Sequence, residues 1–315
     1  MKNYLESSYS SKETEGIFFF GSYENKPQTA SIVIVTYSTK KKDLELCLDA
    51  LTEQKDYDFE IIIVDNNDIE DIAPLISNYK LKYIKLKKNF GVNIGRNIGT
   101  AQSHGEIIIF LDDDAVPAPD FVKQHIIAHR DSEILALRGK SLPKTTNIYN
   151  YFAVSYELGD KIIPWTIDLE GNSSFKKNVL LEVGGFNPNL WGHEGIEISY
   201  RILEKYGDKN KLIYSPNPII YHDYATCFKK YIKKQLRHDT FSNLSTSNFP
   251  YLDNFSAEYE MTNTSLQKSN LELYIRLKLL FIRKITILIK KANRKYHICR
   301  KYMTSSLNGY TREKH

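Results

Sequence analysis

Hydrophobic residues follow two alternating patterns between residues 31 and 111. Short apolar runs rich in β-branched residues predict four strands, over 31–37, 60–64, 81–86 and 106–111. Apolar residues at helical spacing predict helices between them, over 41–53, 72–79 and 93–103. Strand and helix alternate with short connections, which predicts an α/β fold with a mostly parallel sheet covered by helices on both faces. Ligands of such sheets bind outside the carboxyl ends of the strands.

The pattern of hydrophobic and polar residues is different outside residues 31–111. Residues 1–30 are polar apart from Ile17–Phe20, and we interpret them as an N-terminal extension with one short strand. Loop-forming residues become frequent between about 138 and 192, and a helix is predicted from 196 to 206. Residues 226–315 are basic and helical in period, without a sheet element. These changes predict a catalytic domain over 31–225, divided into halves at 31–120 and 121–225, followed by a helical region over 226–315.

Composition narrows the class of protein only a little. A hydrophobic content of 42% and a charged content of 26% are those of an ordinary folded protein. The net charge of +5 over 315 residues is too small to indicate a nucleic-acid binder by itself. Three cysteines far apart favour a reducing compartment over a disulfide framework. Without a secretory pattern at the start or an uninterrupted apolar span, we expect a cytoplasmic protein.

Three consecutive aspartates follow the fourth predicted strand. Asp112, Asp113 and Asp114 place dense negative charge at the carboxyl edge of the sheet, and a cation would relieve their repulsion. Hard carboxylate oxygens suit Mg²⁺ or Mn²⁺. Because side chains alternate along extended backbone, Asp112 and Asp114 are the pair expected to share one ion. The alternative is a solvated acidic turn.

Two further segments lie at the same edge. Asp65 ends the second strand, where its carboxylate could bind a base or ribose hydroxyls or could instead cap a helix. Glycines at 91, 95 and 99 open the third helix, so that one helix face can approach a neighbour closely. Arg96 on that helix is a planar donor suited to phosphate or carbonyl groups, unless it is only a surface residue.

Residues from about 31 to 225 resemble the inverting family 2 glycosyltransferases, which have the GT-A fold. The resemblance is carried by five motifs in order: Ser31–Tyr37; Ile63–Asn67; Asn89–Gly91 with Gly95–Asn97; Phe110–Pro117; and Gly184–Asn187 with Trp191–Glu194. Five such motifs in the right order are much more specific than any one of them.

The resemblance implies roles on the donor side. Thr36, Tyr37 and Asp65 would hold the nucleotide base, with Arg96 near the base or the phosphates. Asp112 would bind ribose or the metal, and Asp114 the metal directly. The motif also adds Asp113 to the donor-binding residues, although strand alternation turns its side chain away.

The resemblance also implies a third metal ligand and a phosphate contact. His222, after another apolar run, would complete a site for Mn²⁺ or Mg²⁺, with an imidazole favouring Mn²⁺ somewhat. The alternative for His222 is a hydrogen-bonded residue at a strand end. Arg237, in the basic stretch from Phe228 to Arg237, would contact a phosphate group.

The acceptor side of the resemblance departs from the family pattern. An inverting transferase needs a general base opposite the leaving diphosphate, and the family supplies it from a Glu-Asp pair. Here Gly195 stands at the Asp position, so Glu194 is the expected base and Glu197, three residues along the helix, the alternative. Asn172, Trp191 and His193 resemble acceptor-binding positions.

Together these implications predict a metal-dependent transferase that moves a sugar from a nucleoside-diphosphate sugar, with UDP expected, to a glycan or lipid-linked acceptor. The sugar would be a hexose or an N-acetylhexosamine, and the setting bacterial polysaccharide or envelope assembly. Two alternatives stay open. A sugar nucleotidyltransferase would need a Gly- and Arg-rich loop after the first strand, where the chain has Thr36–Thr39. A catalytically impaired binding protein on the same scaffold is compatible with Gly195.

The segment 271–301 combines apolar and basic residues at helical spacing. Arg276, Arg283, Lys290 and Lys291 recur about every seven residues, too often for a transmembrane helix. A helix with apolar and basic faces suits the surface of an anionic membrane, which would place the protein at the inner face of the cell membrane. The alternative is packing on the catalytic domain or on a second copy of the chain.

Overall fold

The computed structural model describes residues 13–310 except 25, 39, 67–69, 154, 191, 250, 253–254 and 256–272. The first twelve residues of the predicted N-terminal extension, Trp191 and the start of the 271–301 segment therefore lie outside the described residues. The strands are β1 (Thr14–Phe20), β2 (Gln28–Thr36), β3 (Phe59–Asp65), β4 (Leu81–Leu86), β5 (Gly105–Leu111), β6 (Val116–Pro117), β7 (Ala136–Leu142), β8 (Ile163–Pro164), β9 (Asn172–Lys176) and β10 (Leu212–Tyr221).

Helices are interleaved with these strands. They are α2 (Lys41–Thr52), α3 (Ala73–Ile76), α4 (Val92–Ala101), α5 (Phe121–Ala128), α6 (Lys177–Val183), α7 (Glu194–Tyr206), α8 (Phe228–Asn248) and α10 (Leu273–Tyr310), with 3₁₀ turns η1 (Ile148–Phe152) and η2 (Lys209–Lys211). The strand and helix alternation predicted for 31–111 is confirmed, with α3 shorter than expected. None of the helices in the described part of the chain contains a stretch long and apolar enough to cross a bilayer.

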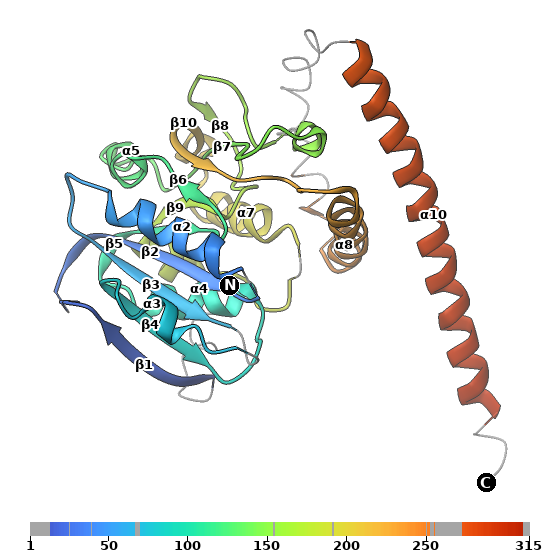
Figure 1. The fold of residues 1–315 in the computed structure, drawn as a ribbon, viewed down its shortest axis with the longest axis horizontal. Helices are drawn as coiled ribbons and strands as arrows, with labels where there is room; N and C mark the ends of the chain where they lie inside the picture. Colours follow the sequence, from blue (N-terminus) through green and yellow to red (C-terminus); the bar gives the residue numbers. More distant parts are fainter. Residues whose placement is uncertain are drawn as a thin grey trace.

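One mixed sheet forms the centre of the molecule, as Figure 1 shows. Its strand order is β1-β4-β3-β2-β5-β9-β7-β10-β6, with β8 beside β10. The block β4-β3-β2-β5 is parallel, as predicted. Beyond β5 the sheet is mixed, because β9 runs antiparallel to both of its neighbours, β5 and β7, whereas β7 and β10 are parallel. β1 pairs antiparallel with β4 at the outer edge, so residues 14–20 are part of this sheet.

Helices cover both faces of the sheet, as the pattern predicted. On one face, α2, α3 and α5 bury Leu48, Ile76 and Phe121 against alternate residues of β2, β3 and β5. On the other face, α4, α6 and α7 bury apolar residues against the intervening positions of the same strands. Alternation along each strand sends neighbouring apolar side chains into opposite layers, which is why continuous apolar runs become central strands.

Glycines bring α4 unusually close to β2. A Cβ on Gly95 would lie 2.6 Å from Val35 Cγ1, and one on Gly99 would lie 2.3 Å from Val33 Cγ1. These contacts confirm the close approach expected from the glycine spacing, since any larger residue would push the helix off the sheet. The helix start therefore stays at the carboxyl edge of β2 and β3.

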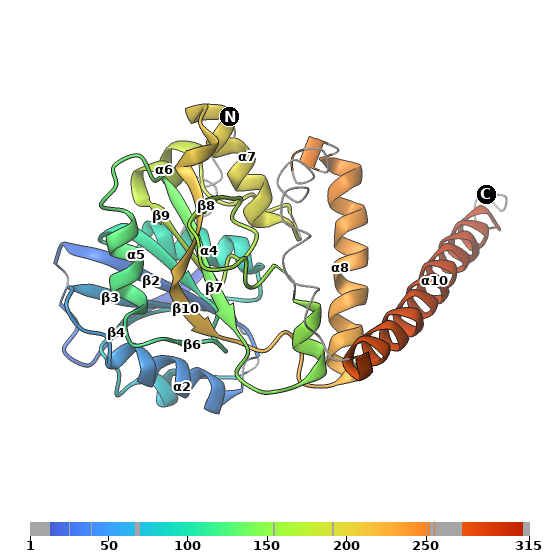
Figure 2. The same ribbon diagram turned by 90° about the horizontal axis from the view of Figure 1, so that it is seen from above.

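The C-terminal helices lie beside the sheet. Figures 1 and 2 show α8 between the sheet and α10. Arg294 of α10 forms an ion pair with Asp239 of α8, and its Nε donates to Asp239 Oδ2 at 2.8 Å. α8 thus joins the outer helix to the part of the molecule that carries the strand ends.

Candidate active site

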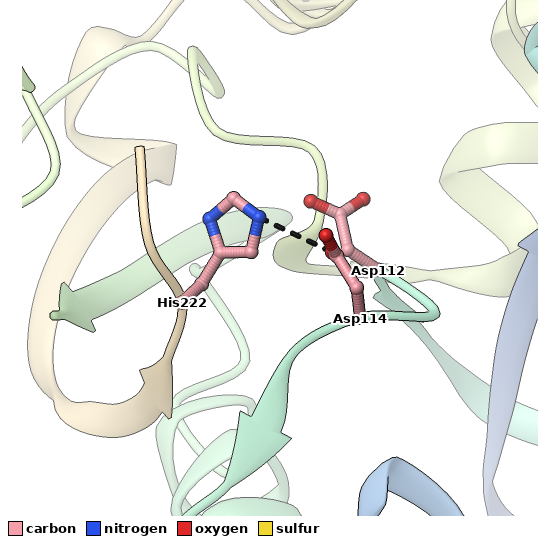
Figure 3. A group of neighbouring side chains, drawn as sticks. All are labelled: Asp112, Asp114 and His222. Atoms are coloured by element: carbon pink, nitrogen blue, oxygen red, sulfur yellow. Dashed lines mark ion pairs between the residues drawn. The ribbon is translucent and has the colours of Figure 1, made fainter. Parts of the chain in front are cut away.

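Three potential metal ligands converge at the carboxyl edge of the sheet. Asp112 and Asp114 follow β5, and His222 follows β10, whose end is fixed by the hydrogen bond from His222 N to Leu142 O at 2.8 Å. His222 Nε2 lies 3.2 Å from Asp114 Oδ1, and one ligand atom from each of the three residues lies within 4.8 Å of the others (Figure 3). The expected convergence of the first and third aspartates is therefore confirmed. Two carboxylates and one imidazole are a donor set that fits Mn²⁺ or Mg²⁺.

Gly171 makes room for the Asp112 carboxylate. The Asp112 backbone N–H donates to Gly171 O at 3.2 Å, where β9 begins beside the end of β5. A Cβ on Gly171 would lie 2.0 Å from Asp112 Cγ. Any side chain at 171 would therefore displace the carboxylate from its place next to Asp114 and His222. Asp113 lies between the two ligands, partly buried in the turn.

Two lysines approach the acidic group from other elements. Lys144, after β7, donates from Nζ to Asp114 O at 2.8 Å. Lys234, on α8, donates to Tyr156 OH at 3.1 Å and lies over the Tyr224 ring, 4.0 Å from its centroid. The Tyr156 ring in turn lies 5.9 Å from that of His222. The helical region after residue 226 therefore contributes a cation to the edge of the site.

Charges in the group shift one another's proton affinities. Burial alone would raise the pKa of Asp114, but His222 and the two lysines hold it below its usual value. Burial lowers the pKa of Lys234 to about 8, although Asp112 and Asp114 oppose this shift. A partly desolvated ammonium beside two carboxylates is suited to bind an anion, because the protein has already removed much of its water.

Arg237 was predicted as the phosphate contact, but its side chain is exposed on α8. Lys234, about one turn earlier on the same helix, is the residue that faces the acidic group. The basic residues of this stretch recur at helical spacing, and only the packing of α8 decides which of them faces inward. Arg237 therefore stays a predicted phosphate contact, and the packing of α8 adds Lys234 as a second candidate.

The predicted base-binding residues meet where β2 and β3 end side by side. Thr36 pairs with Asp65 in the parallel register, Thr36 is buried, and Tyr37 is 42% exposed. Asp65 is fully buried, and its Oδ2 accepts hydrogen bonds from Tyr83 OH at 2.7 Å and Lys85 Nζ at 2.8 Å. Tyr37 is thus the most accessible of the three, and one oxygen of Asp65 is hydrogen-bonded to residues of the neighbouring strand β4.

Helix α4 connects the donor side to the acceptor side. Asn93 Nδ2 donates to Asn187 O at 2.9 Å and Leu190 O at 3.0 Å, while Asn97 exchanges two hydrogen bonds of 2.8 Å with the Phe186 backbone. Arg96, between these asparagines, is only 8% exposed and lies over the Phe186 ring at 5.2 Å. The two asparagines thus hold the 184–190 loop that leads to α7. Arg96 lies between them on α4, and therefore between the donor side and the acceptor side of the site.

The start of α7 carries the predicted base. Glu194 is the first residue of α7 and is partly buried, and its side chain has no hydrogen bond or ion pair with any other described residue. His193 precedes it with φ 63°, and no described group bonds to His193 Nε2, whose ring lies 5.8 Å from that of His238. Both residues lie where α7 begins, which is the place where the acceptor was predicted to bind.

Gly195 and Glu170 occupy the space beside Glu194. A Cβ on Gly195 would lie 1.7 Å from Ile167 O and 2.7 Å from Glu170 Oε1. The Gly195 N–H donates to Glu170 Oε1 at 2.6 Å. Burial and the nearby Glu194 raise the pKa of Glu170 to about 7, with Arg96 acting in the opposite direction. Glycine is therefore required at 195, and residue 170 supplies an acid that interacts electrostatically with Glu194.

Two predicted site residues are turned inward instead. Glu197 is 2% exposed, and both of its oxygens accept hydrogen bonds from Arg201, at 2.9 and 2.8 Å. Arg201 also donates to the Val183 and Gly185 carbonyls, which anchors this pair against α6. The expectation that Glu197 shares the crevice with Glu194 is wrong, because the residue serves helix packing.

Asn172 is the second of these residues. It is fully buried in β9, and its side chain donates to Lys140 O at 2.8 Å and Pro218 O at 3.1 Å. Its Oδ1 lies 3.1 Å from His125 Nε2. The prediction that Asn172 contacts the acceptor is therefore wrong, since its side chain instead joins β7, β9 and β10.

Glu170, Lys144 and Lys234 are residues of the candidate site that sequence reasoning missed. Glu170 directly precedes Gly171–Asn172, a segment noted only for Asn172, and Lys234 was one of several equivalent basic positions. The signal for Glu170 was an acid next to a glycine in a loop at the sheet edge. No such signal singles out Lys234 without the orientation of α8.

Comparison with known proteins agrees with this arrangement. The family model described as glycosyl transferase family 2 matches residues 31–167. The chain is 27% identical over 197 residues to the uncharacterized glycosyltransferase YfnE from Bacillus subtilis strain 168, an alignment covering 59% of this chain and 50% of that protein. It is 27% identical over 227 residues to the hyaluronan synthase of Pasteurella multocida, covering 58% of this chain and 23% of the synthase. The chain thus spans at most half the length of these relatives.

A solved structure shares the fold. The mannosyltransferase PcManGT from Pyrobaculum calidifontis, in complex with GDP-Man and Mn²⁺, matches with a TM-score of 0.53 at 15% identity, covering 99% of this chain and 93% of that one. This likeness confirms the predicted GT-A fold.

Proposed function

Since the chain belongs to glycosyltransferase family 2, we propose that it is a metal-dependent inverting transferase that moves a sugar from a nucleoside-diphosphate sugar to a hydroxyl group. The observation that carries this proposal is the convergence of Asp112, Asp114 and His222 at the carboxyl edge of the sheet. These residues would hold Mn²⁺ or Mg²⁺. The bound cation would stabilise the negative charge that develops on the leaving diphosphate.

Protein groups arranged around this site support the donor half of the proposal. Lys234 and Lys144 are placed to bind the diphosphate oxygens, and Arg96 lies in the wall between donor and acceptor sides. Tyr37, exposed beyond the end of β2, is available to stack on the base, with UDP as the proposed nucleotide. Electrostatic stabilisation of the leaving group is a large contribution to such reactions, so the lysines are part of the chemistry.

Glu194 is the proposed general base. The acceptor oxygen forms a bond to the anomeric carbon while the bond from that carbon to the diphosphate oxygen breaks and its electron pair leaves with the diphosphate. The hydroxyl proton passes to a Glu194 carboxylate oxygen. Its part-buried position at the start of α7 and its lack of an ion pair with the other described residues support this role.

The proposed acceptor is a glycan or lipid-linked glycan in bacterial polysaccharide or envelope assembly, and the proposed sugar a hexose or N-acetylhexosamine. The relationship to a polysaccharide synthase supports a glycan acceptor. On the exposed side of α10, Leu277, Phe281 and Leu288 are 56%, 65% and 66% exposed, which supports contact with the membrane that carries lipid-linked acceptors.

A panel of nucleoside-diphosphate sugars tests the proposal. We expect one donor to raise the melting temperature only with Mn²⁺ or Mg²⁺, and to be hydrolysed slowly without acceptor. Asp114→Asn should abolish both effects, whereas Asp131→Asn, in an exposed loop after α5, should leave them unchanged. Failure of every donor to bind in either condition would overturn the transferase assignment.

A further inference from the structure

The acid that faces Glu194 belongs to the loop before β9. Glu170 is partly buried, and its Oε1 accepts the hydrogen bond from the Gly195 N–H at 2.6 Å. Gly195 is the second residue of α7, so this N–H is one of those left without an intrahelical partner. No side-chain bond from His193 caps the helix. Glu170 therefore caps the start of α7, in the same turn that carries Glu194.

Sterically, position 195 cannot supply an acid of its own. A side chain there would meet Ile167 O at 1.7 Å, a backbone atom that cannot move aside easily, and would meet Glu170 Oε1 at 2.7 Å. The Glu170 carboxylate thus lies where the first atoms of a side chain at 195 would point. The chain has a carboxylate in that place, but it comes from another segment.

We propose that Glu170 supplies the second carboxylate of the acid pair and acts as a positioning residue for Glu194. This inference rests on the proposed function, in which Glu194 takes the acceptor proton. Through its bond to Gly195, Glu170 fixes the first turn of α7 and with it the backbone of Glu194. Its carboxyl group also interacts electrostatically with the carboxylate of Glu194.

Charged groups on two other elements face Glu170. Glu194 comes from α7 and repels its ionised form, while Arg96 comes from α4 and favours it. Burial adds to the effect of Glu194, so the pKa of Glu170 is raised. The protonation of Glu170 therefore depends on the charge of Glu194. An ordinary helix cap would instead be a solvated carboxylate that is ionised at neutral pH.

Kinetics separate positioning from simple capping. Glu170→Gln keeps a hydrogen-bond acceptor of the same shape and removes the charge. We expect kcat to fall about tenfold, less than the roughly 10²–10⁴-fold expected for loss of a general base itself, with an unchanged KM for the donor. The plot of kcat/KM against pH should also change around pH 7, because the Glu170 carboxyl, whose pKa is raised to about 7, is no longer there to titrate.

Glu182→Gln is the matched control, because Glu182 on α6 bonds to Lys205 and Tyr206 at the far end of α7 and lies outside the site. It should leave kcat and the pH profile unchanged. If Glu170→Gln also has the wild-type rate and pH profile, Glu170 is only a helix cap and the inference is overturned.

Titration without substrate tests the pair independently of transfer. In protein labelled with ¹³C at glutamate carboxyls, the Glu170 signal should titrate about one pH unit lower in Glu194→Gln than in the wild type, because the repelling charge is gone. An unchanged Glu170 titration would overturn the pairing even if Glu170→Gln fails to fold. A coupled pair in a protein that turns over no donor would instead defeat the proposed function, so the two failures are distinguishable.

Discussion

Gly171 is the residue on which the position of Asp112 depends most directly, since its missing Cβ leaves the place that the carboxylate occupies. We predict that Gly171→Ala moves the carboxylate and raises the Mn²⁺ concentration needed for half-maximal activity by about 10–100-fold, the range seen when support for a metal ligand is lost. A Mn²⁺ titration of donor hydrolysis measures this.

The control for this change is Gly207→Asn. Gly207 has φ +73°, where asparagine is tolerated, and a Cβ there meets nothing within 4 Å. This variant should keep the wild-type Mn²⁺ dependence. If Gly171→Ala does so as well, the carboxylate has another place to bind the metal.

Glu194 and Glu197 are three residues apart on α7 but have different surroundings. Glu194→Gln should lower kcat on the order of 10²–10⁴-fold and leave stability near that of the wild type, because no described partner is lost. Glu197→Gln leaves Arg201 buried without its counter-charge, which should cost about 3–5 kcal/mol of unfolding free energy, while folded molecules keep their turnover. Urea unfolding and kcat, measured on both variants, separate the two effects. The reverse pattern would assign the base to Glu197.

At the scale of elements, β9 connects the two halves of the sheet with a polar sequence. Ser174 Oγ lies 2.9 Å from both His125 Nδ1 and His129 Nε2, so two buried imidazoles, one on α5 and one at its C-cap, bond to the strand. Burial lowers the pKa of His125 to about 3 and that of His129 to about 4. Both rings are neutral in the folded protein at neutral pH.

This network predicts a loss of stability in mild acid. The unfolded chain binds protons at these histidines below about pH 6.5, whereas the folded chain binds them only near their lowered pKa values. Their contribution to the free energy of unfolding is therefore complete above about pH 6.5 and falls as the pH drops below that value. Between pH 6 and 5 we expect a loss of about 2 kcal/mol per pH unit, from two sites at about 1.36 kcal/mol each at most.

Urea unfolding at pH 7, 6 and 5 measures that slope. His129→Gln retains a polar group next to Ser174 but does not titrate, so it should show about half the wild-type slope. Equal slopes would mean that other groups cause the acid sensitivity.

Elements with a local signature could be predicted from the sequence, and those defined by packing could not. The apolar runs of β2, β3 and β5 and the glycine spacing of α4 predicted the parallel block and the edge where Asp112 and Asp114 lie. β9 was not predicted because its Ser174 is hydrogen-bonded by His125 and His129, which are remote in sequence. The same reason explains the errors at Asn172 and Glu197, since the direction of each side chain depends on packing that the local sequence does not show.

At the scale of the whole molecule, α8 separates two surfaces with different roles. Its inner side brings Lys234 to the acidic group, and its outer side binds α10 (Figure 2). Thr286 of α10 is buried, whereas Leu277, Phe281 and Leu288 are mostly exposed. Because α8 contacts both α10 and the acidic group, a membrane bound by α10 would lie close to the edge of the sheet where the donor is proposed to bind. We therefore propose that α10 contacts the membrane.

The α10 surface predicts binding to anionic vesicles. Besides its exposed apolar residues, α10 carries Lys284, Lys291 and Lys295 on its exposed surface, and this combination attracts anionic lipid. We expect the full chain to float with vesicles containing phosphatidylglycerol and much less with neutral ones. Phe281→Ser with Leu288→Ser should abolish flotation, because the apolar contact is lost while the charge remains. Ile162→Ser with Leu181→Ser removes exposed apolar residues elsewhere and should float like the wild type. If the α10 variant floats equally but halves the mass measured by light scattering, its surface is instead the interface with a second copy of the chain.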